Sequence, residues 1–116
     1  MALQQIIDAT GIFNKDKVYV IDTGGYDYAE VQVVSPTADV NFSATNDSGA
    51  VQGASDGNYK SATNFVAVLG TNITTGTTAN KAIATSIFKF INAAQYLKLD
   101  STDTVSKILI RLYKIS

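Results

Sequence analysis

The stretch that decides the fold is YAEVQVVSPTADVNFSATN, residues 28–46, which holds two runs of alternating apolar and polar side chains. The apolar members are Ala29, Val31 and Val33 in the first run and Val40, Phe42 and Ala44 in the second. A period of two places alternate side chains on opposite faces of a β-strand. Pro36 separates the runs, because proline cannot donate a hydrogen bond to a ladder. The stretch therefore predicts two strands, each with one face on a core.

Similar short runs recur along the chain, at KVYVID (17–22), NFVAVLG (64–70), TSIFKFIN (85–92), QYLKLD (95–100) and VSKILIRLYKIS (105–116). Turn-forming residues separate them at intervals of about 8–12 residues, and no run has a helical period. We predict an all-β fold, an antiparallel β-sandwich of about seven to eight strands that is jelly-roll-like. The expected single domain covers residues 15–116 and follows an N-terminal arm at residues 1–14.

The composition excludes several classes of function. Nine basic and ten acidic residues give a net charge of -1, and no basic cluster suited to nucleic acid is present. The chain has no Cys and no His, so disulfides, zinc sites and a bound cofactor are not expected. We find neither a signal peptide nor an apolar run long enough for a membrane, which predicts synthesis in a cytoplasm. Only 16% of residues are charged, which favours a surface that packs against other proteins.

One segment, GASDG at residues 53–57, matches the G-x-S-x-G pattern of serine hydrolases. That chemistry needs a histidine to accept the serine proton, and it needs a helix after the turn. The chain has no histidine, and a strand-like run follows Gly57. We interpret Ser55 as a turn residue and predict that the protein is not an enzyme.

The longest polar stretch, residues 45–61, carries oxygen ligands suited to calcium at Asn46, Asp47, Asp56 and Asn58. Their spacing does not fit an EF-hand loop, and Asx residues beside glycine commonly form turns. A metal site is therefore not predicted, although calcium or a glycan in this loop stays an open alternative.

The last strand-like run is apolar on both faces. Leu109 and Ile115 oppose Ile108, Ile110 and Leu112, whereas the outer face of an isolated sandwich should be polar. Either the N-terminal arm covers this outer face, or the face contacts another subunit. The candidate interface residues are Leu3, Ile6, Ile7, Ile12, Phe13, Leu109, Arg111, Tyr113 and Ile115.

Tyrosines near turns give a second candidate surface. Tyr26 and Tyr28 flank a turn, and Tyr59 lies in the long polar stretch. Exposed tyrosines beside Asn, Asp and Gln can stack on and bond to sugar rings, although such residues also commonly cap a core. If the chain binds a glycan, we expect these three tyrosines to share one exposed face.

From Tyr28 to Ile115 the chain resembles small all-β virion proteins of tailed bacteriophages. The segments that carry this resemblance are VQVVSPTADVNFSATNDSGAVQG (31–53), SATNFVAVLGTNITTGT (61–77), QYLKL (95–99) and KILIRLYKI (107–115). The segment AAQYLKLDSTDTVSKILIRLYKI (93–115) also looks like the last strands of galactose-binding-like jelly rolls. Neither likeness carries a motif that assigns a role to a particular residue.

The first resemblance implies a structural virion protein, most simply a capsid decoration or cement protein that binds the major capsid protein. A tail or fibre component, or a carbohydrate-binding module for host attachment, is the alternative. The implied partners are virion proteins and further copies of the chain, with no nucleic acid and no membrane. The implied location is the virion.

Overall fold

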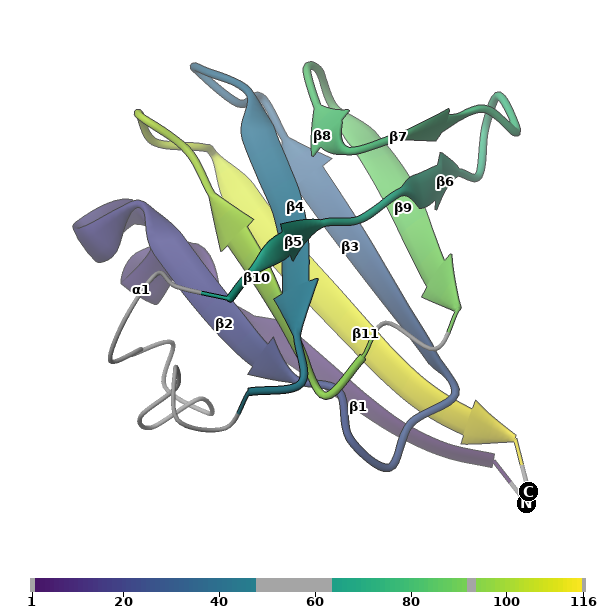
Figure 1. Cartoon of the computed structure of the whole chain (residues 1–116). Coiled ribbons are helices and arrows are strands. Elements are labelled where there is room, and N and C mark those ends of the chain that lie inside the picture. Colours follow the sequence, from purple (N-terminus) through teal and green to yellow (C-terminus); the bar gives the residue numbers. More distant parts are fainter. Residues whose placement is uncertain (1, 48–63, 92–93, 116) are drawn as a thin grey trace.

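The computed structural model describes residues 2–47, 64–91 and 94–115, and the side chains of residues 2 and 3 are not described. The motif GASDG, Tyr59 and the ligand candidates Asp56 and Asn58 lie outside these ranges. Within them the chain forms two antiparallel sheets and one short helix (Figure 1). The prediction of an all-β antiparallel fold is confirmed.

The two sheets contain all the strands of the described chain. The six-stranded sheet has the order β1 (Ala2–Asp8), β11 (Lys107–Ile115), β3 (Tyr28–Val34), β9 (Ser86–Ile91), β6 (Gly70–Asn72) and β7 (Thr78–Ala79). The five-stranded sheet has the order β2 (Val18–Asp22), β10 (Tyr96–Asp100), β4 (Val40–Thr45) and β5 (Val66–Ala67), and β8 (Lys81–Ala82) also pairs with β4.

The predicted strand count is not confirmed. The Thr- and Gly-rich composition of TNITTGTTANKA, residues 71–82, predicts a turn region, yet this segment contains most of β6 and all of β7 and β8. The run NFVAVLG yields only the two-residue strand β5 and the first residue of β6. These pairings are too short to produce an alternating pattern, so only neighbouring strands reveal them.

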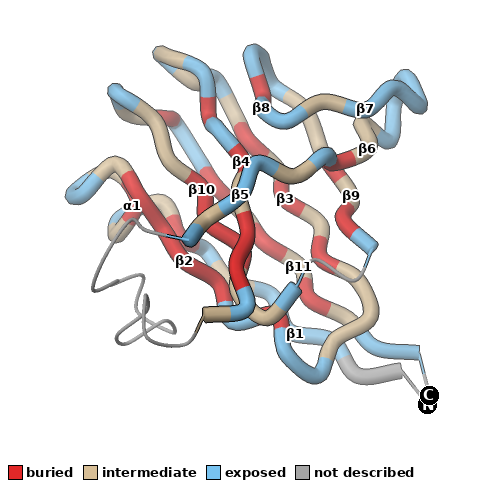
Figure 2. The backbone as a smooth tube through the Cα atoms, in the orientation of Figure 1, coloured by how far each residue is buried: buried red, intermediate tan, exposed pale blue. Residues whose placement is uncertain are grey.

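The core lies between the two sheets (Figure 2). The predicted alternation is confirmed on the central strands, where the inward side chains are at most 4% exposed. Phe42 of β4 reaches across to β9, where its ring centroid lies 5.1 Å from Phe88 and 5.0 Å from Phe90. These three rings join the sheets, because aromatic side chains bury the most apolar area per residue.

Lys98 of β10 departs from the simple pattern. Its position between Leu97 and Leu99 directs it away from the core, as the alternation predicts, yet it is only 7% exposed. Its ammonium lies 4.5 Å from the ring centroid of Phe65 and 3.4 Å from a carboxylate oxygen of Asp100. The aromatic ring and the carboxylate together stabilise a charge that burial would otherwise disfavour.

The N-terminal arm expected at residues 1–14 is not confirmed. Ala2–Asp8 forms β1, which pairs along its whole length with β11, and Thr10–Asp16 forms the helix α1. Helix α1 places Phe13, which is fully buried, in the core between the sheets. No helix in the described ranges is long and apolar enough to cross a membrane.

Hydrogen bonds to Asp8 connect the end of β1 with the start of α1. The Thr10 hydroxyl donates to Asp8 Oδ1 at 2.6 Å, and the Thr10 backbone N–H donates to the same oxygen at 3.1 Å. Lys107 Nζ lies 3.7 Å from the other carboxylate oxygen. Mainly through the Thr10 hydrogen bonds, and also through the Lys107 charge, the pKa of Asp8 is held below its ordinary value of 3.8.

We expect Thr10→Val to raise the pKa of Asp8 toward 3.8, because it removes the hydroxyl donor that favours the carboxylate. A lowered pKa in the folded state means that Asp8 adds stability above pH 3.8, and that this contribution is lost as the pH falls through the folded-state pKa. An NMR titration of the Asp8 carboxyl carbon in both proteins measures the shift. An unchanged pKa would show that the Thr10 hydroxyl is not the cause.

Candidate functional site

The candidate site is the face of the six-stranded sheet that points away from the core, called here the outer face. Its side chains come from β1, β3, β9 and β11, where alternation directs every second residue outward. The outer face comprises Gln4, Ile6, Asp8, Tyr28, Glu30, Gln32, Val34, Ile87, Lys89, Ile91, Lys107, Leu109, Arg111, Tyr113 and Ile115.

Strand β1 lies beside β11 and does not cover it. The two strands are hydrogen-bonded neighbours, with Ile6 opposite Arg111. The interpretation that an N-terminal arm covers the outward side of the last strand is therefore wrong. It fails because the arm's own apolar period makes it a sheet strand, so the outer face stays open within the described chain.

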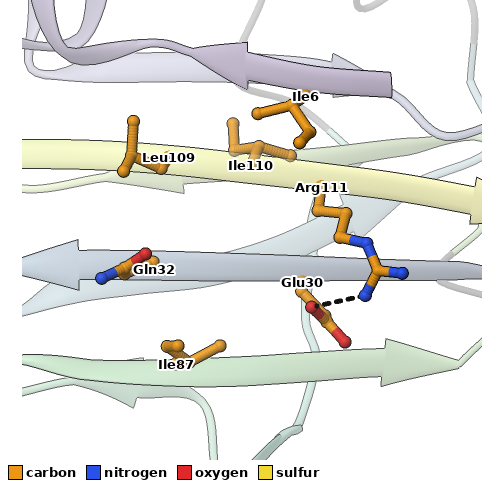
Figure 3. A pocket seen from close by; sticks show the side chains of 7 residues that line it. All are labelled: Ile6, Glu30, Gln32, Ile87, Leu109, Ile110 and Arg111. Atoms are coloured by element: carbon orange, nitrogen blue, oxygen red, sulfur yellow. Dashed lines mark hydrogen bonds and ion pairs between the residues drawn. The ribbon is translucent and has the colours of Figure 1, made fainter. Parts of the chain in front are cut away.

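Charged side chains occupy the middle of the outer face. Strand register places Arg111 between Ile6 and Glu30, and Glu30 between Arg111 and Lys89. Arg111 Nη1 donates to Glu30 Oε1 at 3.3 Å (Figure 3), and Arg111 Nε donates to Gln4 Oε1 at 2.9 Å. The guanidinium is thereby fixed in one orientation while its side chain stays 43% exposed.

A pair of tyrosines lies next to these charges. The rings of Tyr28 and Tyr113 are stacked with their centroids 4.9 Å apart, and the Tyr113 hydroxyl donates to Glu30 Oε2 at 3.3 Å. Lys89 Nζ lies 4.4 Å from the Tyr28 ring centroid, and Arg111 Cζ lies 4.1 Å from that of Tyr113. Cations over ring faces and a shared carboxylate connect these side chains into one cluster.

Apolar side chains surround the cluster. Ile6 and Ile91 are each 65% exposed and Ile115 is 63% exposed, so each leaves most of its surface uncovered. Between the strands the face is hollowed into a depression of about 210 Å³, lined by Ile6, Glu30, Gln32, Ile87, Leu109, Ile110 and Arg111 (Figure 3). Arginine and tyrosine are enriched at protein–protein interfaces, and the centres of such interfaces are more apolar than the rest of the surface.

The predicted interface residues fall into two groups. Ile6, Leu109, Arg111, Tyr113 and Ile115 lie on the outer face, and Leu3 pairs with Lys114 in the same sheet. Ile7 and Ile12 are partly buried against the core. The prediction that Phe13 contacts a neighbouring protein is wrong, because its side chain is 0% exposed in the core.

Two of the three predicted glycan-contacting tyrosines, Tyr26 and Tyr28, do not share one face in the structure. Tyr26 packs against the core and its hydroxyl donates to Gln5 Oε1 at 3.2 Å, whereas Tyr28 lies on the outer face and one of its ring faces stacks on Tyr113. Tyr59 is not among the described residues.

The calcium candidates Asn46 and Asp47 take part in local hydrogen bonds. Asn46 Oδ1 accepts from the backbone N–H of Gln95 at 2.9 Å, and Asp47 Oδ2 accepts from Asn64 Nδ2 at 2.7 Å. In the part of the chain that the structure describes, no three His, Cys, Asp or Glu side chains are grouped as a metal site would require.

Sequence reasoning missed the part of the outer face that β3 and β9 contribute. Glu30 lies there beside Arg111, and Ile87, Lys89 and Ile91 follow on the next strand, although they come from distant segments of the chain. The alternation indicated that each faces outward. It could not indicate that β3 lies between β11 and β9.

The fold and this face together define an all-β protein of two antiparallel sheets with an open, partly apolar outer face. The sequence matches no known protein-family model and no curated protein. Among solved structures, the SPBc2 prophage-derived protein YomS is similar, with a TM-score of 0.64 and 12% sequence identity. The match covers 100% of this chain and 96% of YomS, and at this identity it establishes the fold.

Proposed function

We propose that the chain is a non-enzymatic structural protein of a tailed-bacteriophage particle, and that it attaches to the particle through the outer face. More specifically, we propose that the chain is a capsid decoration protein that binds the major capsid protein. The location would then be the virion, after synthesis in the host cytoplasm. The observation that carries the proposal is the exposed isoleucine around the Arg111 and Tyr113 cluster.

The outer face is costly to leave exposed to water. Burying an exposed isoleucine against a partner would be favourable by roughly 25 cal/mol per Å² of apolar surface removed from water. The surrounding polar groups are already fixed by mutual hydrogen bonds, so a partner need not order them on binding. The low charge of the whole chain, 16%, reduces the desolvation cost of such contacts.

The origin of the structural neighbour supports the phage part of the proposal. YomS is described as prophage-derived, and it shares the fold over nearly all of both chains. The same neighbour fits the resemblance of residues 28–115 to small virion proteins.

We propose further that the two sheets form a jelly roll. Strands β1 to β4 alternate between the two sheets, and β9 to β11 alternate again, which supports this topology. The short strands β6, β7 and β8 would then be an insertion between β5 and β9. Jelly rolls occur in viral capsid proteins and in lectins, so the topology is compatible with both the virion role and its carbohydrate-binding alternative.

We expect Ile91→Glu to reduce the occupancy of the chain on particles at least about tenfold, since an unpaired carboxylate would be buried against the partner. Ile83→Glu is the matched control, because Ile83 is 72% exposed and lies outside the outer face. The chain is co-expressed with the capsid genes of its own genome, particles are purified on a density gradient, and the chain is quantified by mass spectrometry.

Each outcome of this experiment is informative. Wild-type chain that is absent from heads and tails alike would overturn the virion role, and chain that sediments with tails would favour the tail or fibre alternative. Equal losses in Ile91→Glu and Ile83→Glu would show that the outer face is not the contact. Binding to a glycan array without particle association would instead favour host attachment.

A further inference from the structure

Strand β1 is an exposed edge of the six-stranded sheet. It pairs with β11 on one side, and among the described residues no strand pairs with it on the other. It is seven residues long, whereas the other strands that end the two sheets are β2 with five residues and β5 and β7 with two residues each. Short edges limit unwanted pairing, so β1 is the edge best able to accept another strand.

The direction of the backbone groups on β1 follows from one hydrogen bond. The N–H of Ala9, directly after β1, donates to the carbonyl of Ile108 at 3.0 Å. In an antiparallel pair, residues alternately bond to the partner strand and point away from it. Gln5 and Ile7 therefore bond to β11, and the N–H and C=O groups of Gln4 and Ile6 point to the open side.

This edge lacks the usual protection against pairing. Natural edges carry lysine, proline or a β-bulge. Residues 2–7 contain no charged residue and no proline, and the register with β11 runs from Ala2 to Asp8 without interruption. The only charge on the strand is Asp8, at its end.

The space beside the edge is also open. Strands β1 and β2 run along the same side of the molecule, away from β6 and β7 (Figure 1). Between them lies a depression of about 350 Å³, lined in part by Ile7, Tyr19, Ile21 and Leu112 of the two sheets. A partner that pairs with β1 would cover this opening to the core as well as the strand edge.

We propose that the partner at this edge is a second copy of the chain, whose β1 pairs antiparallel with this β1 across a two-fold axis. An antiparallel edge is self-complementary, since each copy offers the same donors and acceptors at Gln4 and Ile6. A net charge of -1 gives little repulsion between copies. A pairing centred near Ile6 keeps the two Asp8 carboxylates apart.

This dimer stands apart from the proposed attachment to a particle, because it uses the strand edge and leaves the outer face open. The two-fold axis would run perpendicular to the sheet, as antiparallel pairing of identical strands requires. Both outer faces would then lie on the same side of one continuous sheet. The dimer would thus present two copies of the candidate site to a common surface.

The test compares wild type with Gln4→Pro by sedimentation equilibrium over a wide range of concentrations. We expect wild type to reach twice the chain mass of 12.3 kDa and Gln4→Pro to stay at the single-chain mass. Proline removes an N–H that faces the open side, so it leaves the ladder to β11 intact. Gln4→Ala is the control, because it removes the bond to Arg111 but keeps the N–H, and it should remain dimeric.

Amide hydrogen exchange gives a second readout that does not depend on a variant. In the dimer, exchange at Gln4 and Ile6 should slow as concentration rises, and circular dichroism should show that Gln4→Pro stays folded. A monomer at every concentration, or a dimer that persists in Gln4→Pro, would overturn the proposal. So would protection of these amides only on particles, which would assign the edge to a different protein. Ile91→Glu should remain dimeric, which separates this result from a failure of particle binding.

Discussion

Phe42→Ala is expected to lower the free energy of unfolding by about 3–5 kcal/mol. Phe42 is 1% exposed, and its ring is the contact between β4 of one sheet and Phe88 and Phe90 of the other. Removing the ring loses its burial and leaves a cavity between the sheets, which the surrounding structure can close only in part. Domains of this size are stable by only about 5–15 kcal/mol, so the loss is a large fraction of the total.

Urea-induced unfolding, followed by circular dichroism, measures this change. Phe65→Ala is the matched control, because it removes the same ring from a half-buried position over Lys98. Phe65→Ala should lower the free energy of unfolding clearly less than Phe42→Ala does. If both variants lowered the free energy of unfolding equally, the packing of Phe42 on Phe88 and Phe90 would not be the main contact that holds the two sheets together.

Asn14→Ala is expected to lower the free energy of unfolding by about 2–3 kcal/mol, although it removes only a small polar side chain. Asn14 Nδ2 donates to the carbonyl of Val105 at 2.9 Å, and its Oδ1 accepts from the N–H of Val105 at 2.9 Å. These two bonds attach α1 to the segment that leads into β11. Val105 is 6% exposed, so both of its backbone groups would be left with little access to water.

The same urea experiment tests this prediction with two further variants. Asn14→Asp keeps the acceptor and loses the donor, so it should lie between wild type and Asn14→Ala at neutral pH. Asn41→Ala changes an exposed asparagine of β4 and should have little effect. A loss in Asn14→Ala no larger than that in Asn41→Ala would show that water replaces the side chain at Val105.

The outward or inward direction of most strand residues could be predicted because it depends on local geometry. Leu109, Arg111, Tyr113 and Ile115 were expected to oppose the buried set of the last strand, and they do. Local geometry is not sufficient for Phe13, which the sequence assigns to a contact surface. An apolar residue two positions after Gly11 gives no sign that the seven-residue helix α1 will carry it into the core.

The strand pairings could not be predicted, because they join segments far apart in the chain. The bond between Arg111 and Glu30 spans 81 residues, and the bond between Arg111 and Gln4 spans 107. No local pattern indicates such a neighbour. For this reason the sequence suggests a separate arm where the structure has an edge strand, and it groups Tyr26 with Tyr28, although the fold places these two side chains on different surfaces.

By itself, the sequence determined that this chain is built from β-strands and which side of most strands is apolar, since side chains alternate with a period of two whatever the strand pairs with. Only the tertiary structure decided which strands are neighbours. That choice brings β1, β3, β9 and β11 together, and it assembles the charged and aromatic cluster of the outer face from both ends of the chain. It also leaves β1 with an open edge. The physical reason is that a strand's neighbours are selected by packing of the whole core, to which every segment contributes at once.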